Sequence, residues 1–354
     1  MIKRDDLRAA VAAGVVTEAQ AASLASLADS RRGARESLAP GDEPFELFRG
    51  FNEIFIVIGL LILASGWVGV NVATMATELV NYQTQAMTMA GIGAVVLWGL
   101  AEYFVRKRRM IAPAIALSVL FAGNAAFGFV AMKSQPFMIA QQDYSSLPWP
   151  FILSTLALFV FWWRFRVPFA LAMIAIGLFI VALLVAAISA GTPTSYKDLF
   201  LLSAGGPFAW ITLALGAGVF IVAMLFDMSD PHRVTRRSAN GFWLHVVAAP
   251  ALINTIALSF LEREGAATNV MLLVVLALFA IVAIVIDRRS FLITAIGYFV
   301  ALATTMFEAD GLAGSILTLG FLLVFLGAFW ERIRAILLRM MPFLPLAKLP
   351  PSVR

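Results

Sequence analysis

The stretch IFIVIGLLILASGWVGVNVATMAT, residues 54–77, decides the fold class of this chain. It holds 24 residues without a charge, and it is flanked by Glu53 and Glu78. At 1.5 Å per residue, a helix of this length reaches about 36 Å, which is enough to cross a hydrocarbon core of about 30 Å. The stretch therefore predicts a transmembrane helix.

Asn71 lies inside this predicted helix, one helical turn after Trp67. An amide side chain is unfavourable against lipid, because its donors and acceptors then have no partners. We therefore expect Asn71 either to hydrogen-bond a neighbouring helix or to line a binding site.

Nine further apolar runs, with at most one charged residue near an end, follow along the chain. Each is long enough to be read as a membrane-spanning helix, and together with the first run they predict an all-α bundle of about ten spans over residues 51–330. The runs cover residues 86–105, 111–132, 148–165, 168–190, 207–227, 242–261, 268–286, 290–308 and 313–330.

Composition agrees with an integral membrane protein. Hydrophobic residues make up 61% of the chain and charged residues 13%, against about 45–50% and about 25% in soluble domains. The formal net charge of +5 does not indicate nucleic-acid binding, because the basic residues fall in the predicted loops. With no cysteine and two histidines, the chain predicts neither a metal site nor a cofactor.

The distribution of lysine and arginine predicts the orientation. Of 26 such residues, 23 fall in the two terminal segments and in four short connections at residues 106–109, 164–166, 233–237 and 287–289. Only Lys133, Lys197 and Arg263 fall on the other side of the predicted membrane. By the positive-inside rule both termini are cytoplasmic, which indicates the inner membrane of a bacterium.

The two terminal segments read as surface structures. Residues 1–50 predict a cytoplasmic helical hairpin and linker, in which Thr17 and Gln20 form a capping box, and we expect this hairpin to dock on the membrane domain or on a protein partner. Residues 331–354 alternate basic and apolar side chains and then become rich in proline. This pattern predicts a basic amphipathic segment on the inner leaflet, or a docking peptide.

Two runs resemble each other. RVPFALAMIAIGLFIVAL (166–183) and RRSFLITAIGYFVAL (288–302) share an arginine, a phenylalanine and Ala-Ile-Gly in the same order. This either reflects chance or indicates a parallel internal repeat of four helices. The repeat would place Asn124 and Asn254 at equivalent depths, and we expect both to face a shared polar interior.

Few polar residues within the predicted spans could bind a ligand or take part in a reaction. Candidates for lining a cavity are Asn71, Asn124, Asn254, Tyr298 and His245, although a single histidine near the interface is more often a satisfied hydrogen-bonding group. The cytoplasmic connection after residue 230 offers His232, Arg233, Arg236 and Arg237 as candidates for binding a lipid phosphate, although topology alone also favours arginines there. Glu102 and Asp227 fall near the cytoplasmic ends of their spans, so we expect no buried carboxylate that couples transport.

Two stretches together carry a family resemblance. The N-terminal pattern DLRAAVAAGVVTEAQAASLASLAD and the later GLLILASGWVGVNVATM resemble bacterial polytopic membrane proteins that are classed only as a domain of unknown function. The resemblance covers residues 5 to about 130 and lacks the Asn-Trp pair that often follows the first span in such relatives. It implies the topology and a cytoplasmic hairpin, and it implies no activity.

Two functions from different classes fit these observations. Passage of a small molecule or lipid is the leading hypothesis, because ten spans exceed what anchoring requires. A membrane scaffold or sensor that binds a partner through residues 1–50 is the alternative. The chain lacks the motifs of intramembrane proteases and nucleotide-binding enzymes, so we assign no catalytic residue and do not expect an enzyme.

Overall fold

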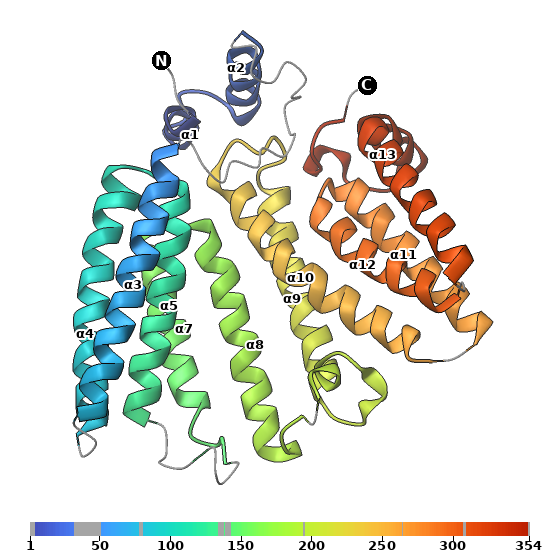
Figure 1. The fold of residues 1–354 in the computed structure, drawn as a ribbon. Helices are drawn as coiled ribbons and strands as arrows, with labels where there is room; N and C mark the ends of the chain where they lie inside the picture. Colours follow the sequence, from blue (N-terminus) through green and yellow to red (C-terminus); the bar gives the residue numbers. More distant parts are fainter. Residues whose placement is uncertain are drawn as a thin grey trace. The chain divides into compact units, whose positions relative to one another are not determined.

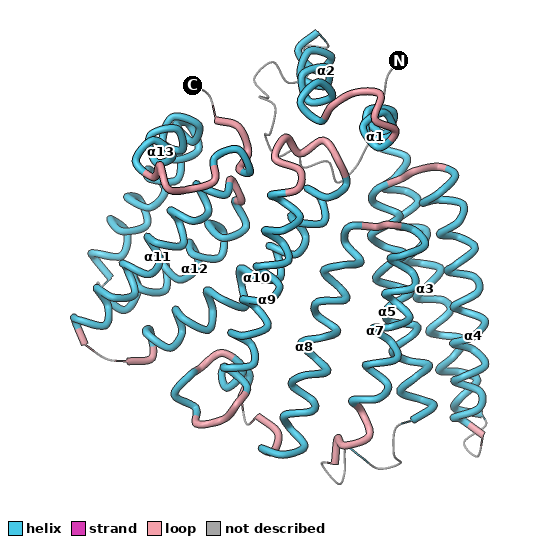
Figure 2. The backbone as a smooth tube through the Cα atoms, turned by 180° about the vertical axis from the view of Figure 1, so that it is seen from behind, coloured by secondary structure: helices cyan, strands magenta, loops and turns pink. Residues whose placement is uncertain are grey.

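The computed structural model describes residues 4–31, 51–77, 81–133, 138, 143–193, 195–263, 265–306 and 309–352. Across these ranges the regular structure is entirely helical, as predicted (Figures 1 and 2). The chain divides into two compact units: unit 1 comprises residues 1–44 and 195–354, and unit 2 comprises residues 45–194.

Unit 2 is a bundle in which one helix contacts the others. Helix α5 packs against α3, α4, α7 and α8. Its core is aromatic, with Phe121 stacked on Phe161 and with Trp98 edge-on to Phe165. The helices are α3 (Phe51–Thr77), α4 (Tyr82–Ala101), which continues into the π-helical turn η1 (Glu102–Lys107), α5 (Ile111–Lys133), α7 (Pro148–Phe165) and α8 (Pro168–Ala190).

Glu53, at the start of α3, is buried within unit 2 and caps a neighbouring helix. Its Oε2 accepts a hydrogen bond of 3.1 Å from the backbone N–H of Ala112 in the first turn of α5. The first N–H groups of a helix have no partner within the helix, and the helix dipole favours a negative charge there. The carboxylate that precedes the decisive stretch therefore ties the start of α3 to the start of α5.

Unit 1 contains the N-terminal hairpin and the second half of the chain. Here α10 packs against α9, α11 and α12, and Gly216 of α9 lies directly against Ala251 of α10. Its elements are α1 (Arg4–Ala12), α2 (Glu18–Arg31), η2 (Tyr196–Leu199), η3 (Leu202–Ala204), α9 (Phe208–Met228), α10 (Arg236–Leu261), α11 (Ala266–Ile286), α12 (Arg289–Met306), α13 (Ala309–Met340) and η4 (Leu346–Lys348).

The four basic connections share one backbone feature. Each contains a non-glycine residue with a left-handed backbone, at φ values of 53–55°. A left-handed residue ends a helix abruptly and lets the chain reverse within a few residues. The short connections predicted from the charge pattern are thus tight turns, and their left-handed residues are Arg109, Arg166, Arg233 and Asp287.

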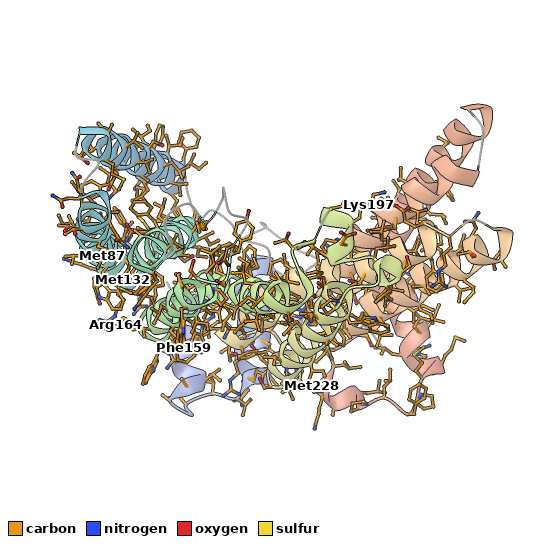
Figure 3. The ribbon with its side chains drawn as sticks, turned by 90° about the horizontal axis from the view of Figure 1, so that it is seen from below. Met87, Met132, Phe159, Arg164, Lys197 and Met228 are labelled. Carbon is orange, nitrogen blue, oxygen red and sulfur yellow. The ribbon has the colours of Figure 1, made fainter. Side chains whose placement is uncertain are left out.

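Seven helices of the described chain are long and apolar enough to cross a membrane: Phe51–Ala76, Gln83–Lys107, Ile111–Lys133, Pro168–Ala190, Phe208–Met228, Arg236–Leu261 and Ala267–Ile286. The other three predicted spans coincide with α7, α12 and the first part of α13. Many large apolar side chains on these helices are exposed, among them Met87 and Phe159 (Figure 3). Such a surface is suited to contact with lipid tails and not with water.

The N-terminal hairpin forms as the sequence indicates. Its capping box is confirmed: the Gln20 N–H donates to Thr17 Oγ1, and the Thr17 N–H donates to Gln20 Oε1. Residues 32–50, which include most of the predicted linker, lie outside the described part of the chain.

The C-terminal segment is helical at first, and its place on the inner leaflet stays a prediction. Helix α13 is kinked at Phe329, whose backbone is not helical, so residues 331–340 form a helical part that follows the kink. Arg334 is fully buried and donates to the carbonyl oxygens of Pro350 and Pro351 at 2.6 and 3.1 Å. The proline-rich tail therefore folds back on α13, because its carbonyl groups satisfy a buried guanidinium.

Candidate functional site

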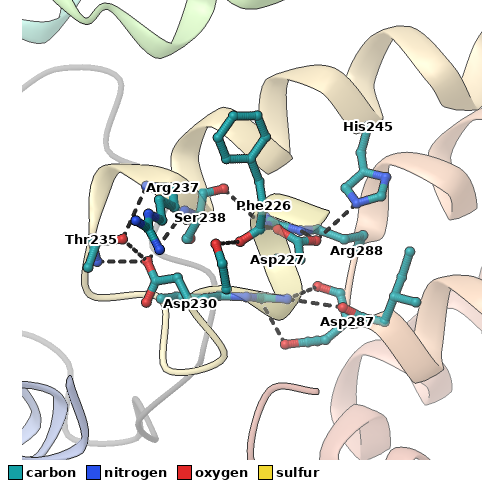
Figure 4. Close-up of polar contacts among 12 residues, drawn as sticks. Phe226, Asp227, Asp230, Thr235, Arg237, Ser238, His245, Asp287 and Arg288 are labelled. Carbon is teal, nitrogen blue, oxygen red and sulfur yellow. Dashed lines mark hydrogen bonds and ion pairs between the residues drawn. The ribbon is translucent and has the colours of Figure 1, made fainter. Parts of the chain in front are cut away.

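Three buried charged or titratable side chains meet at one carboxylate in unit 1 (Figure 4). Asp227, in the last turn of α9, accepts hydrogen bonds from Arg288 Nε at 2.9 Å and from Arg288 Nη2 at 2.5 Å. Its Oδ2 also lies 2.9 Å from Nε2 of His245, which is fully buried on α10. Arg288 donates further to the carbonyl oxygen of Ser238 at 2.9 Å. This triad joins α9, α10 and the turn between α11 and α12.

A second buried ion pair runs alongside the triad. Arg233 Nη1 donates to Asp287 Oδ2 at 3.0 Å, and Nη2 donates to the carbonyl oxygens of Ile286 and Asp287 at 3.1 and 2.7 Å. A cation at the carboxyl end of a helix also satisfies the orphan carbonyl groups there. Trp330 of α13 donates its indole N–H to Asp287 Oδ1 at 2.7 Å. The α9–α10 and α11–α12 turns are thus joined by two crossed arginine–aspartate pairs.

Asp230 is fully buried in the α9–α10 turn and bonds to the backbone at the start of α10. Its carboxylate accepts from the backbone N–H groups of Val234 and Thr235 at 3.1 and 2.8 Å, and from Thr235 Oγ1 at 2.5 Å. A carboxylate at the start of a helix interacts favourably with the free N–H groups and with the helix dipole. This contact fixes the first turn of α10, which also carries Ser238.

The buried charges of unit 1 balance among the described residues. Buried carboxylates without matching cations would be strongly destabilising, because desolvation favours neutral groups. Removing one partner of such a pair costs about 3–5 kcal/mol, since the other charge is left buried and unpaired. The three carboxylates are Asp227, Asp230 and Asp287, and the three guanidinium groups are Arg233, Arg288 and Arg334. We call these six residues with His245 the buried charge network.

A glycine makes room for the triad. A Cβ atom placed on Gly241 would collide with Oδ1 of Asp227 and would lie 3.2 Å from the backbone oxygen of Ala223. Because Asp227 is held by Arg288 and His245, it cannot turn aside as a free side chain would. Gly241 therefore allows α10 to approach α9 closely enough for the triad to form.

The N-terminal hairpin docks on the turn between α9 and α10. Glu18 Oε1 accepts from the backbone N–H of His232 at 2.8 Å, and Arg8 Nε donates to the carbonyl oxygen of Val234 at 3.1 Å. Burial and a hydrogen bond with the Asp230 carboxyl group raise the pKa of Glu18 from 4.5 to about 7, against the opposing effects of the His232 N–H and of Arg237. The hairpin therefore contacts the same segment that carries the buried charge network.

The candidates for lipid phosphate divide into two pairs. Arg233 is buried and bonded to Asp287, so its predicted role in lipid binding is wrong: the adjacent turn supplies a closer acceptor. His232 is partly buried, and its Nδ1 lies 3.4 Å from Glu18 Oε1. Arg236 and Arg237 are exposed, as a lipid-binding role requires.

The expectation that no buried carboxylate couples transport stays a prediction. Asp227, placed near the cytoplasmic end of its span by the sequence, is buried and bonded to two partners. The sequence does not reveal that this charge is matched by Arg288, which follows Asp227 by 61 residues. His245 bonds to Asp227 through Nε2, which is the kind of contact that the more conservative interpretation expects.

The asparagines of unit 2 bond to the backbone. Asn124 Nδ2 donates to the carbonyl oxygen of Ala90 in α4 at 2.8 Å, so it joins two helices. The Nδ2 of Asn71 donates to Trp67 within its own helix at 2.7 Å, and its buried Oδ1 has no partner among the described residues. The prediction of an interhelical hydrogen bond is therefore not met for Asn71.

The remaining candidates lie in unit 1. Asn254 is partly buried on α10, and Tyr298 packs against the apolar core that contains Ile253 and Phe291. Asn124 and Asn254 belong to different units, and their shared interior stays a prediction.

The sequence assigns no site role to five members of the buried charge network, Asp227, Asp230, Asp287, Arg288 and Arg334. It also assigns none to their neighbours Glu18, Ser238, Gly241 and Trp330. A signal was present. The segments DMSDPHR (227–233) and DRR (287–289) both place acidic residues among arginines at the ends of predicted spans, where topology alone asks only for cations. Acidic residues on the arginine-rich side of the predicted membrane indicate ion pairs between neighbouring turns.

Comparison of this chain with protein-family models, with curated proteins and with solved structures finds no match. Within the described ranges, no group of three or more histidine, aspartate or glutamate side chains could hold a metal ion. The chemistry of the site is therefore argued from its own geometry.

Replacing Gly241 with alanine should destabilise the protein by at least about 2 kcal/mol, because the added methyl group displaces Asp227 from Arg288. The measurement is chemical unfolding in detergent micelles. Gly218→Ala is the matched control and should change stability little, because nothing lies within 4 Å of a Cβ atom placed on Gly218 of α9. Equal effects of the two substitutions would contradict this role of Gly241.

Docking of the hairpin should weaken as the pH rises from about 4.5 to about 7. The docked state raises the pKa of Glu18, so it binds an extra proton in this window and is favoured below it. Because the chain has no cysteine, spin labels on Ser23→Cys and Arg236→Cys can report the distance between hairpin and turn. The same two spin labels in a Glu18→Gln protein should show no change of distance with pH. A pH-independent distance in the labelled protein that retains Glu18 would refute the prediction.

Proposed function

We propose that this chain is a multi-pass protein of the bacterial inner membrane, with ten spans and both termini in the cytoplasm. The seven long apolar helices support this proposal, and α7, α12 and α13 supply the three further spans. Lysine and arginine concentrate at the turns after α4, α7, α9 and α11, which the positive-inside rule places in the cytoplasm.

We further propose that the protein passes a small molecule or lipid across the membrane. The supporting observation is the buried charge network. An anchor needs only apolar helices, whereas ionisable side chains buried at the ends of membrane spans are costly and often mark a functional site. The two ion pairs of the network between helix ends are Arg233–Asp287 and Arg288–Asp227.

The packing within the units supports an internal repeat as part of this proposal. In α4, α5, α7 and α8 of unit 2, the second helix contacts the other three, and in α9, α10, α11 and α12 of unit 1 the second helix again contacts the other three. In both sets the first two and the last two helices are joined by a turn with a left-handed residue. Two repeats of four helices are a common basis for carriers.

A sensor or scaffold is the alternative, and the docked hairpin favours it. Glu18 and Arg8 hold the hairpin to the turn that carries Asp230 and Arg233. A partner that bound the hairpin would thus reach the buried charge network through a single turn.

Reporter fusions test the topology. Fusions after Lys133, Lys197 and Arg263 should report a periplasmic location, because these residues follow outward-running spans. Fusions after Arg108, Arg237 and Arg289 should report a cytoplasmic location. A single reporter on the opposite side of the membrane in either series would contradict the proposed topology.

The function is tested by purifying the full-length protein in mild detergent and identifying what remains bound by native mass spectrometry. A retained lipid or small molecule that is exchanged after reconstitution would support passage. A stoichiometric protein that cross-links to residues 1–50, with no retained ligand beyond bulk lipid, would instead support the sensor or scaffold.

A further inference from the structure

The turns after α4 and α7, both in unit 2, carry many more cations than anions. Residues 102–109 and 164–166 contain six lysine or arginine side chains and one carboxylate, that of Glu102. Glu53, at the start of α3, does not offset these charges at the surface, because it is buried and bonded to Ala112 of α5. All six cations are exposed, and we call them the basic cluster: Arg106, Lys107, Arg108, Arg109, Arg164 and Arg166.

The turns of unit 1 use their arginines differently. Arg233 and Arg288 are buried and ion-paired with Asp287 and Asp227, so their charges hold helices together. In the basic cluster one carboxylate serves six exposed cations, so most of the positive charge faces the surroundings of the protein. Such a surface is suited to an anionic partner.

One carboxylate joins the two turns of the basic cluster. Glu102 forms ion pairs with Arg106 at 3.1 Å and with Arg164 at 2.8 Å. It belongs to the π-helical turn η1, in which the N–H of Arg108 donates to the carbonyl oxygen of Tyr103 at 2.9 Å. Single π-helical turns are often found at functional sites. Glu102 therefore brings cations from both turns to one surface of unit 2.

Aromatic rings lie among these cations. Lys107 and Arg108 lie over the exposed ring of Tyr103, at 5.7 and 5.8 Å from its centroid. Arg166 lies over the ring of Trp162 at 5.1 Å. Tyrosine and tryptophan are enriched where the hydrocarbon of a membrane meets the headgroups, because these side chains are apolar with one polar group. The rings thus indicate that the basic cluster lies at the depth of lipid phosphates.

We propose that the basic cluster binds the headgroup of an anionic phospholipid. Guanidinium groups donate paired hydrogen bonds to phosphate oxygens, and each lysine or arginine near an anionic membrane surface strengthens binding about fivefold. A zwitterionic lipid is disfavoured, because the cluster repels the ammonium group that accompanies its phosphate. The inference needs only that unit 2 lies in a membrane, and it does not depend on passage of a substrate.

Native mass spectrometry of the full-length protein in mild detergent tests the lipid preference. Phosphatidylglycerol and phosphatidylcholine with the same acyl chains are titrated against the protein. Phosphatidylglycerol should bind at least about tenfold more tightly, because the two lipids differ only in headgroup charge and shape. Equal affinities would overturn the proposal. Displacement of the lipid by millimolar inorganic phosphate would also overturn it, because the cluster would then be a site for free anions.

A triple variant and a matched control locate the site. The triple variant leaves the ion pairs of Glu102 in place and carries Lys107→Gln, Arg108→Gln and Arg166→Gln. The control removes the same charge from exposed residues outside the cluster through Lys133→Gln, Lys197→Gln and Arg263→Gln. Phosphatidylglycerol should bind the triple variant at least about tenfold more weakly than the parent, and phosphatidylcholine binding should change little. The control should bind both lipids as the parent does.

Equal losses in the triple variant and the control would overturn the proposal, because net charge alone would then attract the lipid. Circular dichroism and size-exclusion chromatography show whether each variant is folded. If the triple variant does not fold, the single substitution Arg108→Gln decides, with an expected loss of about fivefold in phosphatidylglycerol affinity. An unchanged affinity in that folded single variant would refute the assignment of the lipid to this cluster.

Discussion

Asp227 carries a negative charge inside a bundle of apolar helices, and much of unit 1 is arranged so that this charge is satisfied. Arg288 reaches it from a turn 61 residues away, and His245 reaches it from α10. Gly241 lets α10 come close, because any larger residue would occupy the space of the carboxylate. An apolar residue at position 227 would require none of these features, so the charge is the constraint from which the others follow.

The network also relates the parts of unit 1 to one another. The crossed pairs Asp227–Arg288 and Arg233–Asp287 join two helical hairpins, and Trp330 adds α13 through its bond to Asp287. Arg233 and Asp287, the two non-glycine residues with a left-handed backbone in the described part of unit 1, form one of these pairs. Chain reversal and charge pairing therefore occur at the same positions. These contacts connect the ion pairs to α9, α10, α13 and the docked hairpin.

Fold and site differ in how far they follow from the sequence. The helices, the tight basic turns and the Thr17–Gln20 capping box depend on local periodicity and spacing, so the sequence predicts them well. The triad depends on which faces of α9 and α10 meet the α11–α12 turn, and periodicity does not give that register. The exposed Arg236 and the buried Arg233 stand three residues apart in one connection, and only the packed structure distinguishes them.

The central claim is that Asp227 and Arg288 act as one buried unit, and a double-mutant cycle of unfolding free energies in detergent tests it most directly. Asp227→Asn and Arg288→Gln should each destabilise by about 3–5 kcal/mol, and the double variant should lose less than their sum by more than about 1 kcal/mol. The exposed Lys197–Glu262 pair of the same unit is the control, with a coupling below about 1 kcal/mol. Additive effects at Asp227 and Arg288 would contradict the account.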